Sequence, residues 1–236
     1  MRMKKCFVVY CVAYLVLLTL VVGLMCMYPK PELHLLLNSY HTRILDIFFK
    51  YYSMLAEGPL YILALLPIFW KHVKLTVFFA ICELTGGAFL QILKHTICMP
   101  RPASVFENYP DVVLPVVEGV QLHSSNSFPS GHASTFFIFF TCMVIFLTCR
   151  YKTRAARQCK KSQVLFVFLS LVFLFLAALG AYSRVYLSQH FLSDVCMGSF
   201  VGFVTTCLVF YFGRKKFLNI RNNTESAEQA ERPAKP

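Results

Sequence analysis

The chain has 236 residues, of which 57% are hydrophobic and only 14% are charged, and its mean hydropathy is +0.60. Soluble domains carry about 25% charged residues, so the composition excludes an ordinary soluble protein and predicts a membrane protein of one domain. The formal net charge of +12 is that of many nucleic-acid-binding proteins. Here the basic residues stand at the ends of apolar runs and not on one polar face, so we exclude a nucleic-acid partner.

The first apolar run extends from Cys6 to about Tyr28 and follows the basic residues Arg2, Lys4 and Lys5. It is long enough to cross a bilayer and has no small-residue cleavage site, so we expect a retained transmembrane helix and not a signal peptide. Residues 31–50 mix apolar and charged residues and are too polar to span. They predict one amphipathic helix at the membrane interface, and the alternative is a surface helix packed on the protein.

Five further apolar runs predict transmembrane helices, which makes the fold an all-α bundle of six spans with residues 1–212 as a single domain. A long polar loop, residues 98–128, separates the third of these six spans from the fourth, and its role is left open. The polar tail, residues 213–236, is rich in Glu, Ala and Pro, and we expect it to be disordered on the cytoplasmic side. The five runs are residues 52–70, 75–97, 131–149, 164–182 and 190–212.

An even number of spans places both termini on one side of the membrane. The segments on that side hold 17 of the 23 Lys and Arg residues, so the positive-inside rule predicts cytoplasmic termini. The opposite, outer side holds the remaining cations, which are Lys30, Arg43, Lys50, Lys94, Arg101 and Arg184.

The ten cysteines include no C-x-x-C pair and lie mostly in apolar segments, so we expect no disulfide framework. Glu57 and Glu83 are acids within predicted spans. An acid inside a membrane is a candidate for function, but we favour a hydrogen bond to a neighbouring helix for both, and their roles are left open.

Three short motifs stand at the outer ends of the predicted spans, and together they indicate an anion site. In the first, Lys94 is followed after six residues by Arg101-Pro102, and Arg101 is expected to be extended because it precedes a proline. The second, Pro129-Ser130-Gly131-His132, places an N-cap serine and a glycine at a helix start, where free N–H groups attract anions.

The third motif is Ser183-Arg184, five residues, His190, three residues and Asp194. His190 and Asp194 are expected to share one helix face, so that the carboxylate orients the imidazole. This set suits phosphoryl transfer, in which catalysis is mostly positioning and charge stabilisation. His190 would attack phosphorus and His132 would protonate the leaving oxygen. Neither a metal nor another cofactor is implied, because cations supply the charge.

The three motifs, in this order and spacing, resemble those of the type 2 phosphatidic acid phosphatase family over about residues 75–212. The vanadium haloperoxidases are similar at the same site, but they are soluble. The resemblance implies that His190 is the nucleophile, Asp194 its orienting group and His132 the acid. It implies that the phosphate is bound by Lys94, Arg101, Ser130, Gly131 and Arg184.

The resemblance further implies a lipid phosphatase of a bacterial inner membrane with its active site facing the periplasm. Candidate substrates are lipid A, undecaprenyl pyrophosphate, phosphatidylglycerol phosphate and phosphatidate, and the sequence does not choose among them. Two alternatives are a phosphotransferase that passes the phosphoryl group to another lipid and a transporter that uses His190 and Asp194 as a proton relay. The oligomeric state is left open.

Overall fold

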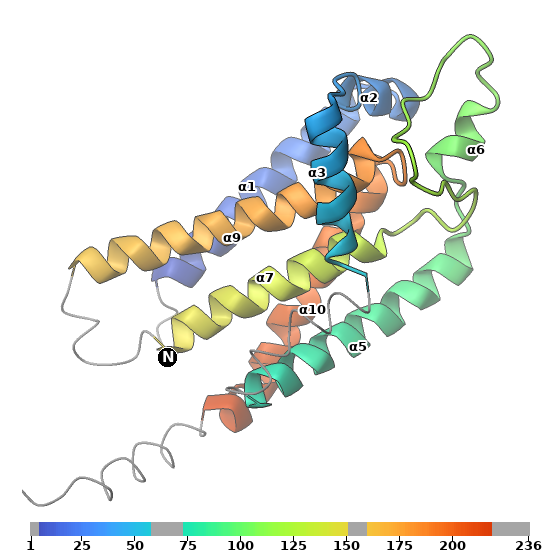
Figure 1. The fold of residues 1–236 in the computed structure, drawn as a ribbon. Helices are drawn as coiled ribbons and strands as arrows, with labels where there is room; N and C mark the ends of the chain where they lie inside the picture. Colours follow the sequence, from blue (N-terminus) through green and yellow to red (C-terminus); the bar gives the residue numbers. More distant parts are fainter. Residues whose placement is uncertain (1–4, 58–72, 151–159, 219–236) are drawn as a thin grey trace, which may run out of the picture.

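The computed structural model of the protein describes residues 5–57, 73–150 and 160–218, and these residues form helices and loops without a strand. The helices run along one bundle, with two shorter helices crossing its end (Figure 1). In chain order they are α1 (Lys5–Met27), α2 (Lys30–Leu37), α3 (Arg43–Met54), α5 (Val73–Ile97), α6 (Pro102–Phe106), α7 (Gly131–Arg150), α9 (Lys160–Tyr186) and α10 (Leu192–Leu218).

Within the described residues, five helices are long and apolar enough to cross a membrane, namely α1, α5, α7, α9 and α10. The outer faces of these helices carry exposed apolar side chains, among them Val12, Leu15 and Leu20 on α1. A contiguous apolar surface of this kind suits a hydrocarbon environment. Most of the predicted span over residues 52–70, residues 151–159 between the next two predicted spans after the long loop, and the tail from residue 219 lie outside the described residues. α10 continues to Leu218, beyond the predicted end at residue 212.

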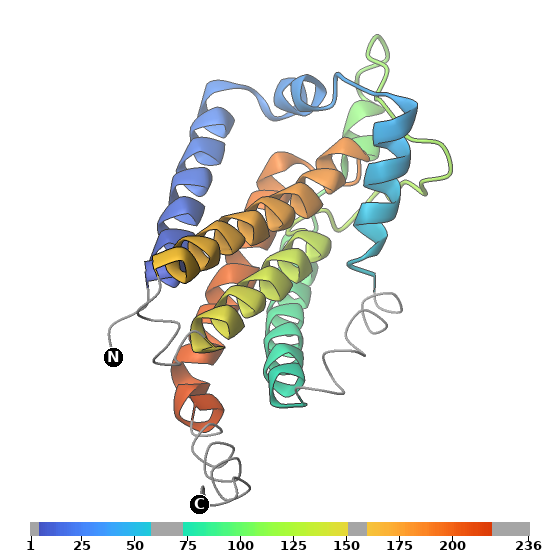
Figure 2. The ribbon, with the colours of Figure 1, turned by 60° about the vertical axis from the view of Figure 1, so that its left-hand side comes forward.

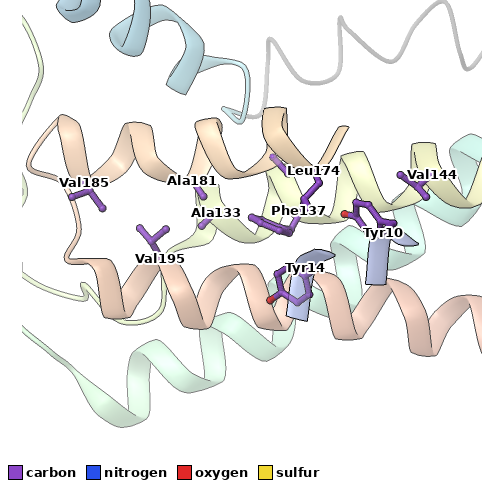
Figure 3. Close-up of a cluster of buried hydrophobic side chains, with 10 residues drawn as sticks. Tyr10, Tyr14, Ala133, Phe137, Val144, Leu174, Ala181, Val185 and Val195 are labelled. Carbon is purple, nitrogen blue, oxygen red and sulfur yellow. The ribbon is translucent and has the colours of Figure 1, made fainter. Parts of the chain in front are cut away.

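The helix α7 lies at the centre of the bundle, where it packs against α9 and α10, while α1 and α5 lie on its flanks (Figure 2). Figure 3 shows part of the core, in which Phe137 of α7 lies near Tyr14 of α1 and Leu174 of α9. Both buried tyrosine hydroxyls of this core are paired: Tyr10 Oη lies 2.8 Å from Thr141 Oγ1, and Tyr14 Oη lies 3.3 Å from Ser199 Oγ. Such pairing is needed because an unpaired polar group in an apolar environment is costly.

Two glycines of α10 allow it to approach α7 closely. A Cβ atom at Gly198 would collide with the backbone oxygen of Ser130, and one at Gly202 would lie 2.5 Å from the backbone oxygen of Ser134. Small residues at helix crossings let backbones approach in this way in membranes. The first turn of α7 is therefore fixed directly on α10.

The single amphipathic helix predicted over residues 31–50 is wrong, because the structure has two helices, α2 and α3, with a break at residues 38–42. The break is local: Thr42 is extended and caps α3 by accepting a hydrogen bond from the Leu45 N–H at 3.3 Å. On α3, Phe49 is buried while Ile44 is 80% exposed, so an apolar face of α3 points outward.

Two smaller expectations concern side chains in the spans. Thr135 Oγ1 of α7 donates a hydrogen bond to Glu83 Oε2 of α5 at 3.3 Å, which confirms the predicted bond between neighbouring helices. The cysteines that the structure describes are free thiols, so no disulfide framework is present in that part of the chain.

Candidate active site

The three motifs come together at one end of the bundle, where four helix ends meet (Figures 1 and 2). Lys94 lies in the last turn of α5, His132 in the first turn of α7, Arg184 in the last turn of α9 and Asp194 in the first turn of α10. Arg101 is the N-cap of α6, with the extended backbone predicted from the following proline. Its Nη1 atom donates to the backbone oxygen of Gln189, next to His190, at 3.2 Å.

His190 does not share a helix face with Asp194 as predicted, because α10 begins at Leu192 and His190 lies in the loop before it. This loop turns back on α9: the N–H groups of Gln189 and His190 both donate to the backbone oxygen of Arg184, at 3.0 and 3.1 Å. The loop still brings His190 Nδ1 to 3.7 Å from Asp194 Oδ2. That distance is longer than a direct hydrogen bond.

Ser127 fills the gap between His190 and Asp194. Its hydroxyl donates to Asp194 Oδ2 at 2.5 Å, and its oxygen lies 3.5 Å from His190 Nδ1. Because the hydroxyl hydrogen points to the carboxylate, the oxygen is left to accept from an Nδ1–H group. This arrangement favours the tautomer whose lone pair is on Nε2, which is the form needed for attack through that atom.

The surroundings keep His190 neutral at physiological pH. The side chain is 1% exposed, and burial lowers the pKa of His190 to about 4. The Asp194 carboxylate opposes this shift, and the positive charges of Arg101 and Arg184 add to it. A neutral imidazole is the nucleophilic form of histidine.

Asp194 is held by several donors besides Ser127. The Phe191 N–H donates to Oδ2 at 3.0 Å and Ser193 Oγ donates to Oδ1 at 3.1 Å. Lys30 at the start of α2 places its Nζ atom 3.7 Å from Oδ1. These contacts stabilise the ionised carboxylate and fix its orientation.

The N-terminus of α7 has the features predicted from the second motif. Ser130 caps it, since its Oγ atom accepts from the Ala133 N–H at 3.4 Å, and its own N–H donates to the backbone oxygen of Asp194 at 2.9 Å. The N–H groups of Gly131 and His132 have no acceptor in the described parts of the chain. A Cβ at Gly131 would meet no atom within 4 Å, so the space beside these donors is open.

The three cations differ in how they are held. Arg101 Nε donates to the Ser125 backbone oxygen at 2.9 Å, and Arg184 Nη1 donates to Ser53 Oγ at 2.5 Å. The Nε–H of Arg184 is buried without a partner, and Lys94 makes no hydrogen bond or ion pair to the residues that the structure places. Unpaired buried donors are rare and call for a reason, and a bound anion would supply one.

The His132 side chain also has unused hydrogen-bonding capacity. Its Nε2 atom is buried and has no hydrogen-bond partner among the described residues, and Glu57 Oε1 lies 3.8 Å away. His132 lies within electrostatic range of His190, Arg184, Lys94 and Arg101. The structure thus brings all eight predicted site residues to one end of the bundle.

Sequence reasoning missed several residues that shape this site. Ser127, Gln189 and Ser53 have no motif of their own, and only their contacts with Asp194, Arg101 and Arg184 reveal them. Glu57, for which a hydrogen bond to a neighbouring helix was predicted, does approach the neighbouring helix α7, but its Oε1 atom lies 3.8 Å from His132 Nε2, which is longer than a hydrogen bond.

The fold resembles two solved structures. Crystal structures similar to this chain include LpxE of Aquifex aeolicus, with a TM-score of 0.56 and 21% identity over 76% of this chain and 93% of that chain. Another is a transmembrane PAP2-type phosphatidylglycerolphosphate phosphatase of Bacillus subtilis, with a TM-score of 0.53 and 19% identity over 90% of this chain and 98% of that chain. No curated protein matches the sequence significantly.

The sequence profile of the PAP2 superfamily matches residues 74–218, which is more than half of the chain and includes all three motifs. The apolar helices and these membrane relatives make the chain an integral membrane protein. Its motifs, their meeting at one end of the bundle and the profile match together show that the chain belongs to the PAP2 superfamily.

Proposed function

We propose that this protein is a lipid phosphatase that hydrolyses a phosphate on a lipid headgroup through a phosphohistidine intermediate. One observation carries the proposal. A buried imidazole kept neutral, with its Nδ1 side turned to Ser127 and Asp194, lies at the same end of the bundle as buried donors that have no partner among the described residues. A tetrahedral anion with one reactive phosphorus–oxygen bond fits those donors and that nucleophile.

In the proposed reaction, His190 Nε2 attacks the phosphorus and the bond from phosphorus to the leaving oxygen breaks. His132 gives a proton to that oxygen, so the lipid leaves as an alcohol. His132, now neutral, takes a proton from a water molecule as that water attacks the phosphohistidine, which releases inorganic phosphate and restores both imidazoles.

The phosphate oxygens would be held by Lys94, Arg101 and Arg184 and by the donors at the start of α7. These include the N–H groups of Gly131 and His132 and the hydroxyl hydrogen of Ser130, which its capping bond leaves free. Charge in the transition state spreads over the equatorial phosphate oxygens, and fixed cations stabilise it. We therefore expect hydrolysis to need no metal ion.

A lipid substrate is supported by the position of the site at the end of apolar helices. α3 lies beside the site through Ser53, and Glu57 follows its end. The helix turns apolar side chains such as Ile44 and Ile47 outward. A helix of this kind is suited to the membrane interface, where lipid headgroups lie. The two similar structures are those of LpxE and of a phosphatidylglycerolphosphate phosphatase, so phosphate monoesters on lipids are the first substrates to test.

The test is His190→Ala in purified protein, with phosphate release from phosphatidate in detergent micelles measured in the presence of EDTA. We expect the wild type to turn over and the variant to lose activity by at least ~10³-fold, because the nucleophile is gone. The variant should still unfold in one cooperative thermal transition, so that the loss of activity reports the missing nucleophile and not an unfolded protein. Full turnover by His190→Ala would contradict the assignment of the nucleophile.

The same assay separates the alternative reactions. Transfer to a second lipid would consume phosphatidate without matching release of inorganic phosphate. A transporter would move substrate across a vesicle membrane and release no phosphate. A strict need for added magnesium would contradict the proposed use of protein cations.

A further inference from the structure

A second carboxylate, besides Asp194, lies at the active site. Glu57 follows the end of α3, its side chain is 48% exposed, and its Oε1 atom lies 3.8 Å from His132 Nε2. It is also within electrostatic range of Arg184. Asp194, by contrast, is fully buried and turned to the Nδ1 side of His190. The two carboxylates therefore flank different histidines.

The nitrogen that Glu57 approaches identifies the part of the substrate it would meet. In the proposed reaction, His132 protonates the leaving oxygen. Nε2 is the ring nitrogen that is buried without a hydrogen-bond partner among the described residues, so it is the atom available for this step. The Glu57 carboxylate is 3.8 Å from Nε2. It would therefore lie next to the part of the substrate that leaves with that oxygen.

A charge at this place discriminates between leaving groups. When the substrate is a diphosphate, the leaving group is itself a phosphate, and its negative charge would develop beside Glu57. Like charges at such distances repel, and the repulsion increases in a partly water-excluded site. When the substrate is a monoester, the leaving group is an alcohol, which is neutral and can present a hydroxyl donor to the carboxylate.

We propose that Glu57 is a specificity residue that selects lipid phosphate monoesters, whose leaving group is an alcohol, against lipid diphosphates. This inference rests on the proposed phosphatase activity and narrows its substrate class. No new step is added to the reaction. Glu57 lies on the leaving-group side, next to His132 Nε2, while the reacting phosphate stays with Lys94, Arg101 and Arg184.

The experiment compares kcat/KM for phosphatidate and for farnesyl diphosphate, in the same micelles, between the wild type and Glu57→Gln. The substitution keeps the shape and removes the charge. We expect the wild type to prefer phosphatidate, and Glu57→Gln to raise kcat/KM for the diphosphate by about tenfold, which corresponds to ~1.4 kcal/mol. The kcat/KM for phosphatidate should stay within about threefold of the wild-type value, since a neutral leaving group interacts only weakly with the charge.

Two controls separate charge from structure. Glu57→Asp keeps the charge and should keep the preference for the monoester. Glu118→Gln changes a carboxylate on the loop beside Lys50, which neither site histidine contacts, and should leave the ratio unchanged. Because Glu57 is half exposed, the difference between wild type and Glu57→Gln should also shrink at high ionic strength.

The specificity role would be overturned if Glu57→Gln changed kcat/KM equally for phosphatidate and farnesyl diphosphate, so that the ratio of the two values stayed that of the wild type. For a variant with a lowered unfolding midpoint, the ratio of kcat/KM for the two substrates is compared, because unfolded molecules lower both values by the same factor. Failure of the proposed function looks different: the wild type then releases phosphate from neither substrate, and His190→Ala has no activity to remove.

Discussion

At the scale of single residues, the main finding is that the nucleophile and its orienting acid are joined through Ser127. The serine donates to Asp194 and leaves an acceptor for His190 Nδ1–H. Ser127 is itself fixed, because its N–H donates to the backbone oxygen of Met99 at 2.9 Å. The orientation of the nucleophile therefore depends on the loop between α6 and α7 as well as on α10.

The prediction at this scale concerns Ser127→Ala. We expect kcat to fall by about 10- to 100-fold, because a hydrogen bond to a charged group is worth ~1.5–3 kcal/mol, while KM for phosphatidate changes little. The measurement is steady-state phosphate release. Ser193→Ala removes the contact with the other carboxylate oxygen, Oδ1, and should have a smaller effect. A fall in Ser127→Ala confined to KM would contradict the orienting role.

At the scale of elements, the active site is held by two fixed attachments. The first is the crossing of α7 and α10, where Gly198 lies against the backbone of Ser130. The second is the loop that carries His190, whose Ser188 hydroxyl accepts a bond from Asn38 Nδ2 of the α2 end at 2.8 Å and donates to the Pro115 oxygen at 2.6 Å. The end of α2 and the loop around Pro115 thus hold the loop that carries His190.

For the helix crossing we predict that Gly198→Ala lowers both stability and activity. The added Cβ would collide with backbone and not with a flexible side chain, so overpacking should cost ~1–3 kcal/mol. Separation of α7 from α10 would also move the Ser130 cap away from Asp194. Thermal unfolding and phosphate release are the measurements.

The matched control for this crossing is Gly87→Ala on α5, where a Cβ would meet no atom within 4 Å. It should be neutral or slightly stabilising, because alanine favours helix. If Gly198→Ala behaved like Gly87→Ala, the close approach of α10 to α7 would not be a constraint on the site.

At the scale of the whole molecule, the site residues gather at one end of the bundle, at the ends of α5, α7, α9 and α10. The charge pattern of the sequence predicts that this end lies outside the cytoplasm. An outer-face site would act on lipids of the outer leaflet. Cys98, which directly follows α5 at this end, is exposed and provides a reporter of the side on which the site lies.

We predict that a variant retaining Cys98 as its single cysteine reacts, in intact cells, with a maleimide that cannot cross the membrane. A variant retaining only Cys142, which is fully buried, should react only after denaturation. Labelling is read by a mass shift of the protein. Reaction of Cys98 only after the cells are opened would place the active site on the cytoplasmic face.

What the sequence alone determined follows from local chemistry. Apolar runs of sufficient length can only be helices in a membrane, so the spans α1, α5, α7, α9 and α10 could be predicted within a few residues. The motifs, with the N-cap at Ser130 and the extended Arg101, were readable because prolines, glycine and capping residues act within a few positions.

Only the tertiary structure decided which distant groups meet. The bridge from His190 to Asp194 through Ser127 and the approach of Glu57 to His132 join residues up to 75 positions apart. Such contacts depend on how helices cross and where loops turn back, and no period or spacing in the chain encodes them. The residue types at the site were therefore visible in the sequence, while the bonds that orient them required the fold.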